Sequence, residues 1–505
     1  MSEKVEIKEN VGFLSYRLYG RKKIFTAEEN ITADNIISVT NKAVSLHTQN
    51  LNEEEYLYWY RRGKQPILNR MREIRSELTK TVVVNNAEQV VTFKNGYFLV
   101  SPTSYYSLFE DKEVTDNVKK FNDYCLASGK AIADNEIVDW FDTVGLGVQY
   151  VEPDRNGSER HPFHTYSLDP RSAFNVYSYR PGNRRVMGIN IVIQGEETLF
   201  DVFTREWHFL LKGGSSHPEV STDENQFGSA YELVAMEKNI IGEIPIIEYQ
   251  YNVNRMGCFE AAIPICDEIN EMQSQLAEGI EEQIQQLCVA YNCQFDDGVT
   301  ANDIRKAGML VLRSTNGGDG AGNADFKILS SNVSQNEIQN SINSLYEQLL
   351  DKTGLPSISR DDGGTSDNGS AVYLRSGYSI ADTHRRNTED FWRKSDREFR
   401  KVALAILKFR FPDFKLDEED FEINIEPPTM SNLLVKTQAA LNMRTLGLAP
   451  EIWLERSGLS IDPLTDIEIS KDYIYKFYEN EMTPASGTPL KDEEQIEEVP
   501  ALEID

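Results

Sequence analysis

The sequence predicts an α+β protein that is mainly helical. Two patterns with apolar residues three and four positions apart, at residues 261–290 and 334–354, predict long helices. A third helical pattern runs from Ser370 to about Phe409, and β-rich runs separated by turn residues fill positions 144–251. The chain has 505 residues, 40% of them hydrophobic, so it is long enough to form several compact units with real cores.

The charge balance is strongly acidic. Eighty-one Asp and Glu residues stand against 52 Lys and Arg, which leaves a formal net charge of −29. A protein that grips DNA tightly concentrates Lys and Arg to displace counterions, so an extended basic face is not expected. Solubility alone explains such a balance, and so does a surface that stands near nucleic acid without adhering to it.

Nothing in the sequence indicates a membrane segment, because no apolar run approaches the roughly 20 residues that cross a bilayer. The first ten residues, MSEKVEIKEN, are charged and lack the apolar core of a secretory signal. We therefore expect a soluble, intracellular protein without membrane contact.

Metal and cofactor chemistry is not indicated either. No CxxC or CxxH pair exists, which favours reduced structural thiols over a zinc site for the five cysteines Cys125, Cys258, Cys266, Cys288 and Cys293. Four histidines of the β-rich stretch lack acidic or cysteine partners at ligand spacing: His161, His164, His208 and His217. We expect no metal, no cofactor and no catalytic residue.

A helix is predicted near the start of the chain. Thr26 to Glu29 matches a capping box, and an apolar stripe continues through Ile36, Val39, Ala43 and Leu46.

The aromatic cluster Tyr56 to Tyr60 leads into Arg61, Arg62 and Lys64. Aromatic and basic residues together suit nucleic acid, but a helix that packs its aromatics inward and exposes its basic residues is the favoured interpretation.

The segment 88–100, EQVVTFKNGYFLV, predicts a β-hairpin, because Asn95-Gly96 supplies the residues of a tight turn between β-rich runs. Helical patterns resume around 114–143. The runs of residues 144–251 then predict an antiparallel meander or sandwich.

The helix predicted over residues 261–290 begins at Pro264 and would be roughly 40 Å long. Its apolar stripe comprises Ile265, Ile269, Met272, Leu276, Ile280 and Ile284, and continues to Leu287 and Tyr291. Acidic residues occupy much of the remaining surface. A narrow stripe on a long acidic helix must be buried against a neighbour, which could be another copy of the chain.

An insert follows at residues 291–333. Thr300 to Asp303 resembles a helix start, and MLVLR (309–313) is predicted to pair as a strand with FKIL (326–329). The Gly-rich run between them, STNGGDGAGNAD, lacks the Lys-Ser/Thr of a phosphate-binding loop. A flexible hairpin tip is therefore favoured over a phosphate site.

A second capping box, Ser334 to Glu337, opens the helix that ends at Gly354 and Pro356. Its apolar face comprises Ile338, Ile342, Leu345 and Leu349. The helices on either side of the insert can pair antiparallel.

The helix from Ser370 to about Phe409 is predicted to bend at Gly377. Its buried side comprises Phe391, Phe399, Val402, Ile406 and Phe409. A short strand in EINIEPPT and helices at about 431–446 and 450–457 follow, before an acidic tail that we expect to be disordered.

Three segments carry a family resemblance: EIPIIEYQYNVNRMGCFEAAIPICDEIN, DKTGLP and GGTSDNGSAVYLRSGYSIAD. Because of the order and separation of these segments, the chain resembles the siphovirus-type portal proteins of tailed double-stranded DNA bacteriophages. The resemblance extends from about residue 50 to about residue 460. The resemblance implies the phage portal fold of wing, stem, clip and crown. It also implies a dodecameric ring at one capsid vertex, with a central channel for DNA.

The resemblance further implies a division of the chain. It gives a wing (1–260), a first stem helix (261–290), a clip (291–333), a second stem helix (334–354), a tunnel loop (355–369), a long wing helix (370–414), a crown (415–482) and an acidic tail (483–505).

Three residue sets follow from this division. The apolar stripes of both stem helices would pack the stem. The tunnel loop would face DNA with Ser357, Ser359, Arg360, Asp361, Asp362, Gly363, Gly364, Thr365, Ser366, Asp367, Asn368 and Gly369. The clip would dock the motor and adaptors with Arg313, Asn316, Gly317, Gly318, Asp319 and Gly320. Arg360 could meet phosphate transiently, and an ordinary surface connection remains an equal interpretation of this loop.

The expected function is therefore a non-enzymatic DNA conduit and assembly platform. Expected partners are other copies of the chain, double-stranded DNA, the terminase large subunit, head–tail adaptors, and the major capsid and scaffolding proteins. The expected location is the virion, and the host cytoplasm during assembly. Two alternatives stay open: a head–tail neck adaptor, and a metal-dependent nuclease that uses Asp361 and Asp362.

Overall fold

The structure is a computed structural model of the whole chain. It describes residues 20–71, 79–109, 111–155, 157–194, 197–213, 231–284, 287–291, 293–294, 313–314, 325–329, 335–357, 377–426, 433–460, 463 and 465–471. The chain divides into two compact units, Met1–Pro428 and Thr429–Asp505.

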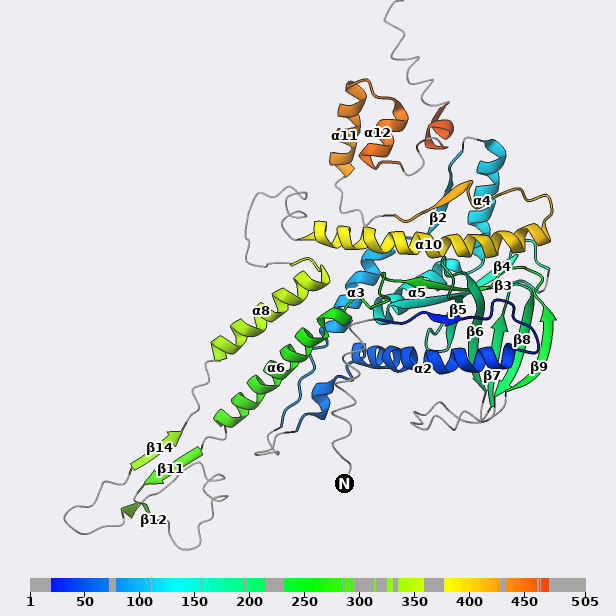
Figure 1. Ribbon diagram of the computed structural model, residues 1–505. Coiled ribbons are helices and arrows are strands. Elements are labelled where there is room, and N and C mark those ends of the chain that lie inside the picture. The colour runs from blue at the N-terminus through cyan, green and yellow to red at the C-terminus, as the bar shows by residue number, and fades with distance from the viewer. Residues whose placement is uncertain are drawn as a thin grey trace, which may run out of the picture. The chain divides into compact units, whose positions relative to one another are not determined.

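Helices dominate the first unit (Figure 1). They are α2 (Ile36–Arg61), α3 (Asn86–Phe98), α4 (Lys112–Ala127), α5 (Lys130–Val144), α6 (Ile263–Ile284), α8 (Gln335–Thr353) and α10 (Tyr378–Arg410), with the short 3₁₀ helices η1 (Pro66–Asn69) and η3 (Glu260–Ala262). Together with the sheets below, they confirm the predicted α+β class.

The β-rich stretch forms two sheets. The larger has the order β1-β5-β6-β7-β8-β9, made by β1 (Ile24–Thr26), β5 (Ala173–Ser178), β6 (Arg185–Gln194), β7 (Glu197–Phe203), β8 (Trp207–Gly213) and β9 (Glu232–Lys238). The smaller has the order β10-β3-β4, made by β10 (Ile246–Gln250), β3 (Leu146–Pro153) and β4 (Phe163–Leu168). All pairings are antiparallel except that of β1 with β5, so the predicted meander is confirmed.

Helix α2 packs on the larger sheet. Ile36, Val39 and Ala43 are buried against sheet residues such as Phe174 and Val202. The helix begins at Ile36, so the capping box predicted at Thr26 to Glu29 is wrong. Thr26 ends β1 instead, and its hydroxyl accepts a hydrogen bond from the Glu28 N–H in the turn that follows.

The hairpin predicted at residues 88–100 is also wrong, because this segment lies in α3. Ala87, Val90 and Val91 are buried in one apolar cluster and Phe98 in another. Their spacing of three, four and seven is helical. Tertiary burial of this face in two clusters along the helix outweighs the local turn preference of Asn95-Gly96.

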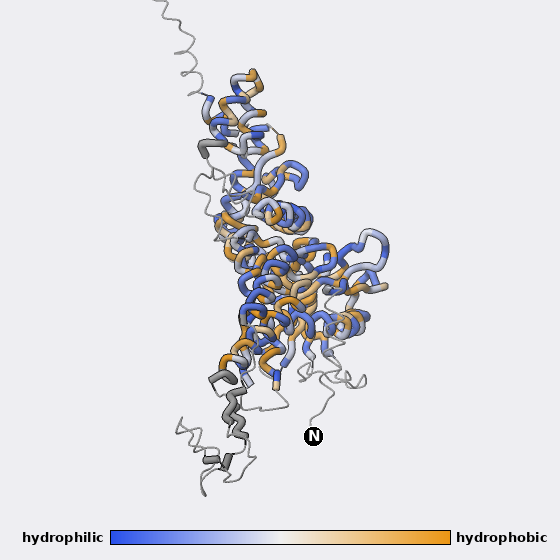
Figure 2. Tube along the Cα trace, turned by 90° about the vertical axis from the view of Figure 1, so that its left-hand side faces the viewer, coloured by the Kyte–Doolittle hydropathy of each residue, from blue (hydrophilic) through white to orange (hydrophobic). Residues whose placement is uncertain are grey.

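Helix α10 covers the largest core of the first unit. Trp392, Phe399 and Val402 pack there with residues of α4, α5 and the small sheet formed by β2 (Ser104–Ser107) and β15 (Phe421–Asn424). Hydrophobic residues, orange in Figure 2, gather in the interior of the first unit. Phe409, predicted to be buried, is 68% exposed.

The start of α10 also differs from the prediction. Gly377 has a φ of 80° and immediately precedes the helix, so it does not bend a helix interior. Residues 370–376 lie outside the described part of the chain.

The second unit contains α11 (Leu433–Thr445) and α12 (Pro450–Ser457), which pack against each other. Both confirm the predicted helices. The strand predicted in EINIEPPT is β15, and it belongs to the first unit through its pairing with β2.

Candidate functional site: a helical pair and its attachment

Helices α6 and α8 form an antiparallel pair (Figure 1). Beyond them, β11 (Leu287–Tyr291) pairs antiparallel with β14 (Asp325–Leu329). The strand FKIL therefore pairs with residues just after α6. The predicted pairing of FKIL with MLVLR is wrong. Leu287 and Tyr291 lie in β11 and not on a helical stripe, because α6 ends at Ile284.

The apolar stripe of α6 is progressively less covered along the helix. Ile269 is 2% exposed, Met272 and Leu276 are half-buried, and Ile280 is 45% exposed. On α8, Leu349 and Ile342 are buried, whereas Leu345 and Ile338 are half-buried. One neighbouring helix therefore leaves part of the stripe open.

An apolar cluster attaches the pair to the body. Ile263 and Cys266 of α6 and Leu349 of α8 are buried there with Leu57 of α2 and Val91 of α3. Polar contacts between elements flank the cluster. The Tyr60 hydroxyl donates to Asp267 at 2.7 Å, and the Gln89 side-chain amide donates to the Tyr346 hydroxyl at 2.6 Å.

The polar face of α6 binds the backbone of residues 79–84, which we name the strap. The N–H groups of Val84, Val82 and Lys80 donate to the side chains of Asn270, Ser274 and Glu278, at 2.9, 2.9 and 3.1 Å respectively. Four helical residues rise about 6 Å. Two residues of extended chain span about 6.6 Å, so alternate strap residues match every fourth helix residue.

The acidic face predicted for α6 is therefore not entirely solvated. Glu278 is only 5% exposed and also forms an ion pair with Arg70 at 2.8 Å. Asn270 and Ser274 are buried as well. This face is a second attachment surface, opposite in chemistry to the apolar stripe.

A tight turn between β10 and α6 fixes where the helix leaves the body. Asn252 holds the turn, since its side-chain oxygen accepts from the Met256 N–H and its amide donates to the Met256 carbonyl. Gly145 and Gly257 let other backbone approach this turn. A Cβ on Gly145 would lie 2.1 Å from the Arg255 carbonyl oxygen, and one on Gly257 would lie 2.3 Å from that of Thr143.

A buried acidic cluster lies beside this turn. Arg21 pairs with Glu53 at 3.2 Å and with Glu260 of η3. Glu54, fully buried, has no hydrogen-bond partner for either carboxylate oxygen among the described residues. Burial raises the pKa of Glu54 well above its usual value and that of Glu53 to about 7.

The segment DKTGLP ends α8 against α10. Gly354 has a φ of 67°, and the N–H of Leu355 returns to the carbonyl of Leu350. A Cβ at Gly354 would lie 2.9 Å from His384 of α10, so both its backbone angle and the space require glycine. The predicted helix stop at Gly354 is confirmed.

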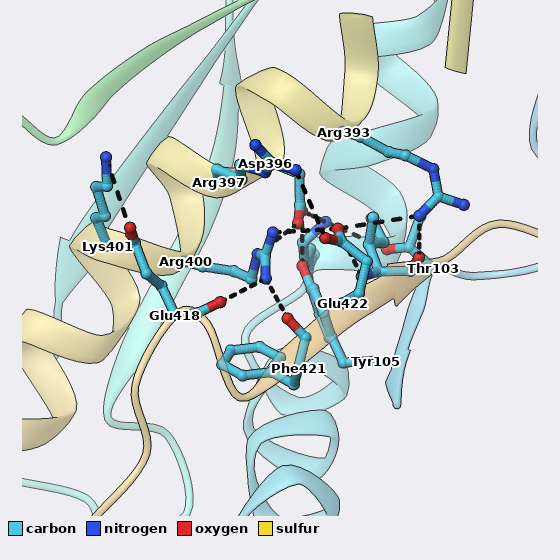
Figure 3. Close-up of polar contacts among 12 residues, drawn as sticks. Thr103, Tyr105, Arg393, Asp396, Arg397, Arg400, Lys401, Glu418, Phe421 and Glu422 are labelled. Carbon is cyan, nitrogen blue, oxygen red and sulfur yellow. Dashed lines mark hydrogen bonds and ion pairs between the residues drawn. The ribbon is translucent and has the colours of Figure 1, made fainter. Parts of the chain in front are cut away.

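Helix α10 holds β15 through a buried ionic network (Figure 3). Arg400 contacts Asp396 at 3.2 Å and Glu422 at 3.1 Å, and donates to the carbonyls of Glu418 and Phe421. The Tyr105 hydroxyl of β2 donates to Asp396 at 2.7 Å. This network fixes the long helix over the core.

Lys130 of α5 extends the same network. Its ammonium lies 2.5 Å from Asp134 and 4.0 Å from Asp396. Burial raises the pKa of Asp396 to about 6, while Lys130 and Arg400 act in the opposite direction. Two buried cations thus face two buried carboxylates.

The comparison with known protein families decides the identity. The profile of the family described as phage portal protein, SPP1 Gp6-like, matches residues 44–456. The chain belongs to this family. The resemblance found in the sequence is confirmed over nearly the span expected for it. A search of curated proteins found no match.

Membership in the portal family establishes the general class of the molecule. Portal proteins are structural components of the bacteriophage capsid that take part in genome packaging, and they are not enzymes. In the described part of the portal chain, no helix is long and apolar enough to cross a membrane.

The structure places the predicted stem residues on α6 and α8, where Ile265 and Leu349 belong to the attachment cluster, and Ile269 and Ile342 are buried outside it. The side chain of Ile284 lies outside the described residues. Of the predicted clip residues, only Arg313 is described, in β13 (Arg313–Ser314), which pairs with β12 (Cys293–Gln294). The helix start predicted at Thr300 lies outside the description.

Of the predicted tunnel loop (355–369), the structure describes Leu355 and Pro356, which are buried, and Ser357, which is exposed, but not residues 358–369. Their DNA-facing role stays a prediction. The acidic tail lies outside the described residues as well.

The thiols and imidazoles have ordinary surroundings where they are described. Cys125, Cys258 and Cys266 form no disulfide. His161 contacts the Ala127 carbonyl, and His208 contacts Asp201 at 3.2 Å. Within the described segments, no group of three His, Cys, Asp or Glu side chains could hold a metal ion.

Several residues of the attachment were missed by sequence reasoning. The strap, Arg21 and Gly145 all act on residues more than a hundred positions away, so no local pattern marks them. One signal was available: Asn270, Ser274 and Glu278 recur every fourth residue on α6, which indicates a continuous polar face.

Proposed function

We propose that this portal protein forms a dodecameric ring at a single capsid vertex. The ring serves as the conduit for double-stranded DNA during packaging and ejection, and it initiates capsid assembly. Head-to-tail contacts around a closed ring give cyclic symmetry. The central channel would be lined in part by acidic residues, which let a polyanion pass without binding it tightly.

One observation carries the proposal. A chain of the portal family has an antiparallel helical pair, α6 and α8, whose apolar stripes are only partly covered within the subunit. An apolar stripe that stays open within a subunit is stabilised when neighbouring subunits pack against it. In the ring, α6 and α8 would be the stem, and the exposed side of Ile280 would meet an adjacent subunit.

The remaining parts of the chain would take the roles of the portal family. The insert at 291–333 would dock the terminase large subunit during packaging and head–tail adaptors afterwards. The loop at 355–369 would reach the DNA with Arg360. The body would contact the major capsid and scaffolding proteins, and residues 415–482 would be the crown.

Electron microscopy of the purified full chain tests the ring directly. We expect twelve-fold particles with a central hole and a tapered stem. A protein that is monomeric at every concentration, or that forms only a small flat collar, would contradict the proposal.

Docking of the motor needs a separate test. Deletion of residues 316–322 should leave the ring intact and weaken the binding of terminase and adaptors, measured by co-sedimentation. Unchanged binding in a variant that still forms rings would exclude this segment as the docking site.

A further inference from the structure

A surface at the end of α2 concentrates cations on aromatic rings, and we name it the cation–aromatic patch. It comprises Tyr58, Trp59, Arg62, Lys64, Trp140 and Arg171. Tyr58, Trp59 and Trp140 are half-buried, and Arg62 and Lys64 are exposed. Only part of the predicted inward packing of the aromatics holds, because Tyr60 is fully buried and its neighbours are not.

The rings fix the positions of the cations. The Arg62 and Arg171 guanidinium groups each lie 4.3 Å from the centre of the Tyr58 ring, and the Lys64 ammonium lies 3.4 Å from that of Trp59. Tyr58 in turn stacks on Trp140 at 5.5 Å. Side chains held in this way lose less conformational entropy when a partner binds.

The charges of the patch are unevenly compensated. Arg171 is neutralised by Asp169 at 2.6 Å. Arg62 and Lys64 have no ion pair with a carboxylate of the described residues. Two guanidinium groups thus share one ring while only one of them is neutralised, so a carboxylate that docks beside Arg62 would relieve their repulsion.

A hollow of about 590 Å³ adjoins the patch, and its lining includes Tyr58, Arg62, Trp140, Glu136 and Asp139. Carboxylates on the lining repel the uniformly charged phosphate backbone of a nucleic acid, whereas a protein surface can place a carboxylate beside Arg62 and hydrogen-bond donors beside Glu136 and Asp139. Tyr, Trp and Arg are the residues most enriched among interface hot spots. The lining therefore fits a protein better than a nucleic acid.

We propose that the cation–aromatic patch is a contact between neighbouring copies of this chain, and that it receives an acidic surface of the next subunit. The argument for this occupant is charge complementarity. With a net charge of −29, the chain itself offers an acidic partner for two unpaired cations. The inference rests on the proposed ring and names one of its interfaces.

The test compares two charge-reversal variants of the full chain. Arg62→Glu with Lys64→Glu should raise the protein concentration needed for ring formation by roughly tenfold or more. Lys119→Glu with Lys120→Glu makes the same change of charge on exposed residues of α4 and should leave assembly unchanged. Mass photometry measures the oligomers, and circular dichroism checks that both variants fold.

A third variant separates charge from stacking. Trp59→Ala removes the ring beneath Lys64 without changing the charge, and it should weaken assembly less than the double reversal. Wild-type rings together with unaffected rings in the Arg62 and Lys64 variant would overturn this inference and leave the proposed function standing. Absence of wild-type rings would instead contradict the proposed function.

Nucleic acid is the rival occupant, and the same variants address it. Fluorescence anisotropy with a short double-stranded DNA should show no difference between wild type and the Arg62 and Lys64 variant. A variant that forms normal rings but loses DNA binding would assign the patch to DNA and overturn the inference.

Discussion

Two buried ionic clusters of the first unit differ in how well cations compensate their carboxylates. Around α10, Arg400 and Lys130 face Asp396 and Asp134, so cations and carboxylates balance. Beside the turn before α6, Arg21 faces Glu53 and Glu260, while Glu54 lies close by with no hydrogen bond from the described residues. The cations of the first cluster favour the ionised form of its carboxylates, whereas the second cluster favours the protonated form.

The pKa values reflect this difference. Burial raises the pKa of Asp396 to about 6, and two cations limit the rise. Burial raises the pKa of Glu54 well above its usual value, and Arg21 is the cation that opposes it. A balanced cluster should therefore be damaged by removing a partner, whereas the unbalanced one should gain from losing a carboxylate charge.

The largest expected effect is that of Arg400→Met. The change leaves Asp396 without its closest cation and removes donors to the carbonyls of Glu418 and Phe421, so we expect a loss of about 3–5 kcal/mol in unfolding free energy. Urea unfolding followed by tryptophan fluorescence measures it, since Trp392 lies in the adjacent core.

A double variant sharpens this result. Adding Asp396→Asn should recover part of the loss, because a neutral amide at position 396 no longer needs the Arg400 cation. Equal instability of the single and double variants would show that packing, and not charge, accounts for the loss.

Glu54→Gln should raise the free energy of unfolding, the opposite of the effect expected for Arg400→Met. Glu54 keeps its proton to a higher pH in the folded chain than in the unfolded chain, where its pKa is near 4.5. The stability of the wild type should therefore fall as pH rises above about 4.5, as the unfolded state releases its proton first.

The glutamine variant lacks this loss. It should exceed the wild type by about 1–3 kcal/mol at pH 8 and match it near pH 4. Urea unfolding at both pH values measures the difference. Glu55→Gln, an exposed neighbour on α2, is the matched control and should change little. A variant equally stable at both pH values relative to wild type would mean that Glu54 is ionised and solvated.

Neither cluster could be predicted from the sequence, although most elements could. The stripe from Ile265 to Ile280 predicts α6, because helical spacing is a local property. Arg21 and Glu260 are more than two hundred residues apart, and only the folded chain joins them.

The errors have the same cause. Asn95-Gly96 favours a turn locally, but the burial of Val90, Val91 and Phe98 in two separate clusters selects the helix α3. Phe409 continues the spacing of α10, yet the core ends before it and the ring stays exposed. Tertiary contacts decide where a correct local pattern stops.

Ser274→Ala removes a hydrogen bond between two uncharged groups, so it provides a reference for the effects at the two ionic clusters. It removes the acceptor for the Val82 N–H at 2.9 Å and should cost about 1 kcal/mol. Hydrogen exchange at Val82 should accelerate, because the middle contact of the strap is lost. Gln275→Ala, on the exposed face of the same helix, should leave that exchange unchanged.

The smallest expected effect is that of Lys401→Ala, on the same helix as Arg400. Its ammonium lies 3.3 Å from Glu398 and 3.8 Å from Glu418, and all three side chains are more than a third exposed. Water screens such pairs, so the loss should stay below about 1 kcal/mol and shrink further in high salt. Urea unfolding in low and high salt measures it. A loss as large as that of Arg400→Met would mean that burial does not separate the two cations, and the contrast between balanced and unbalanced buried clusters would lose its physical basis.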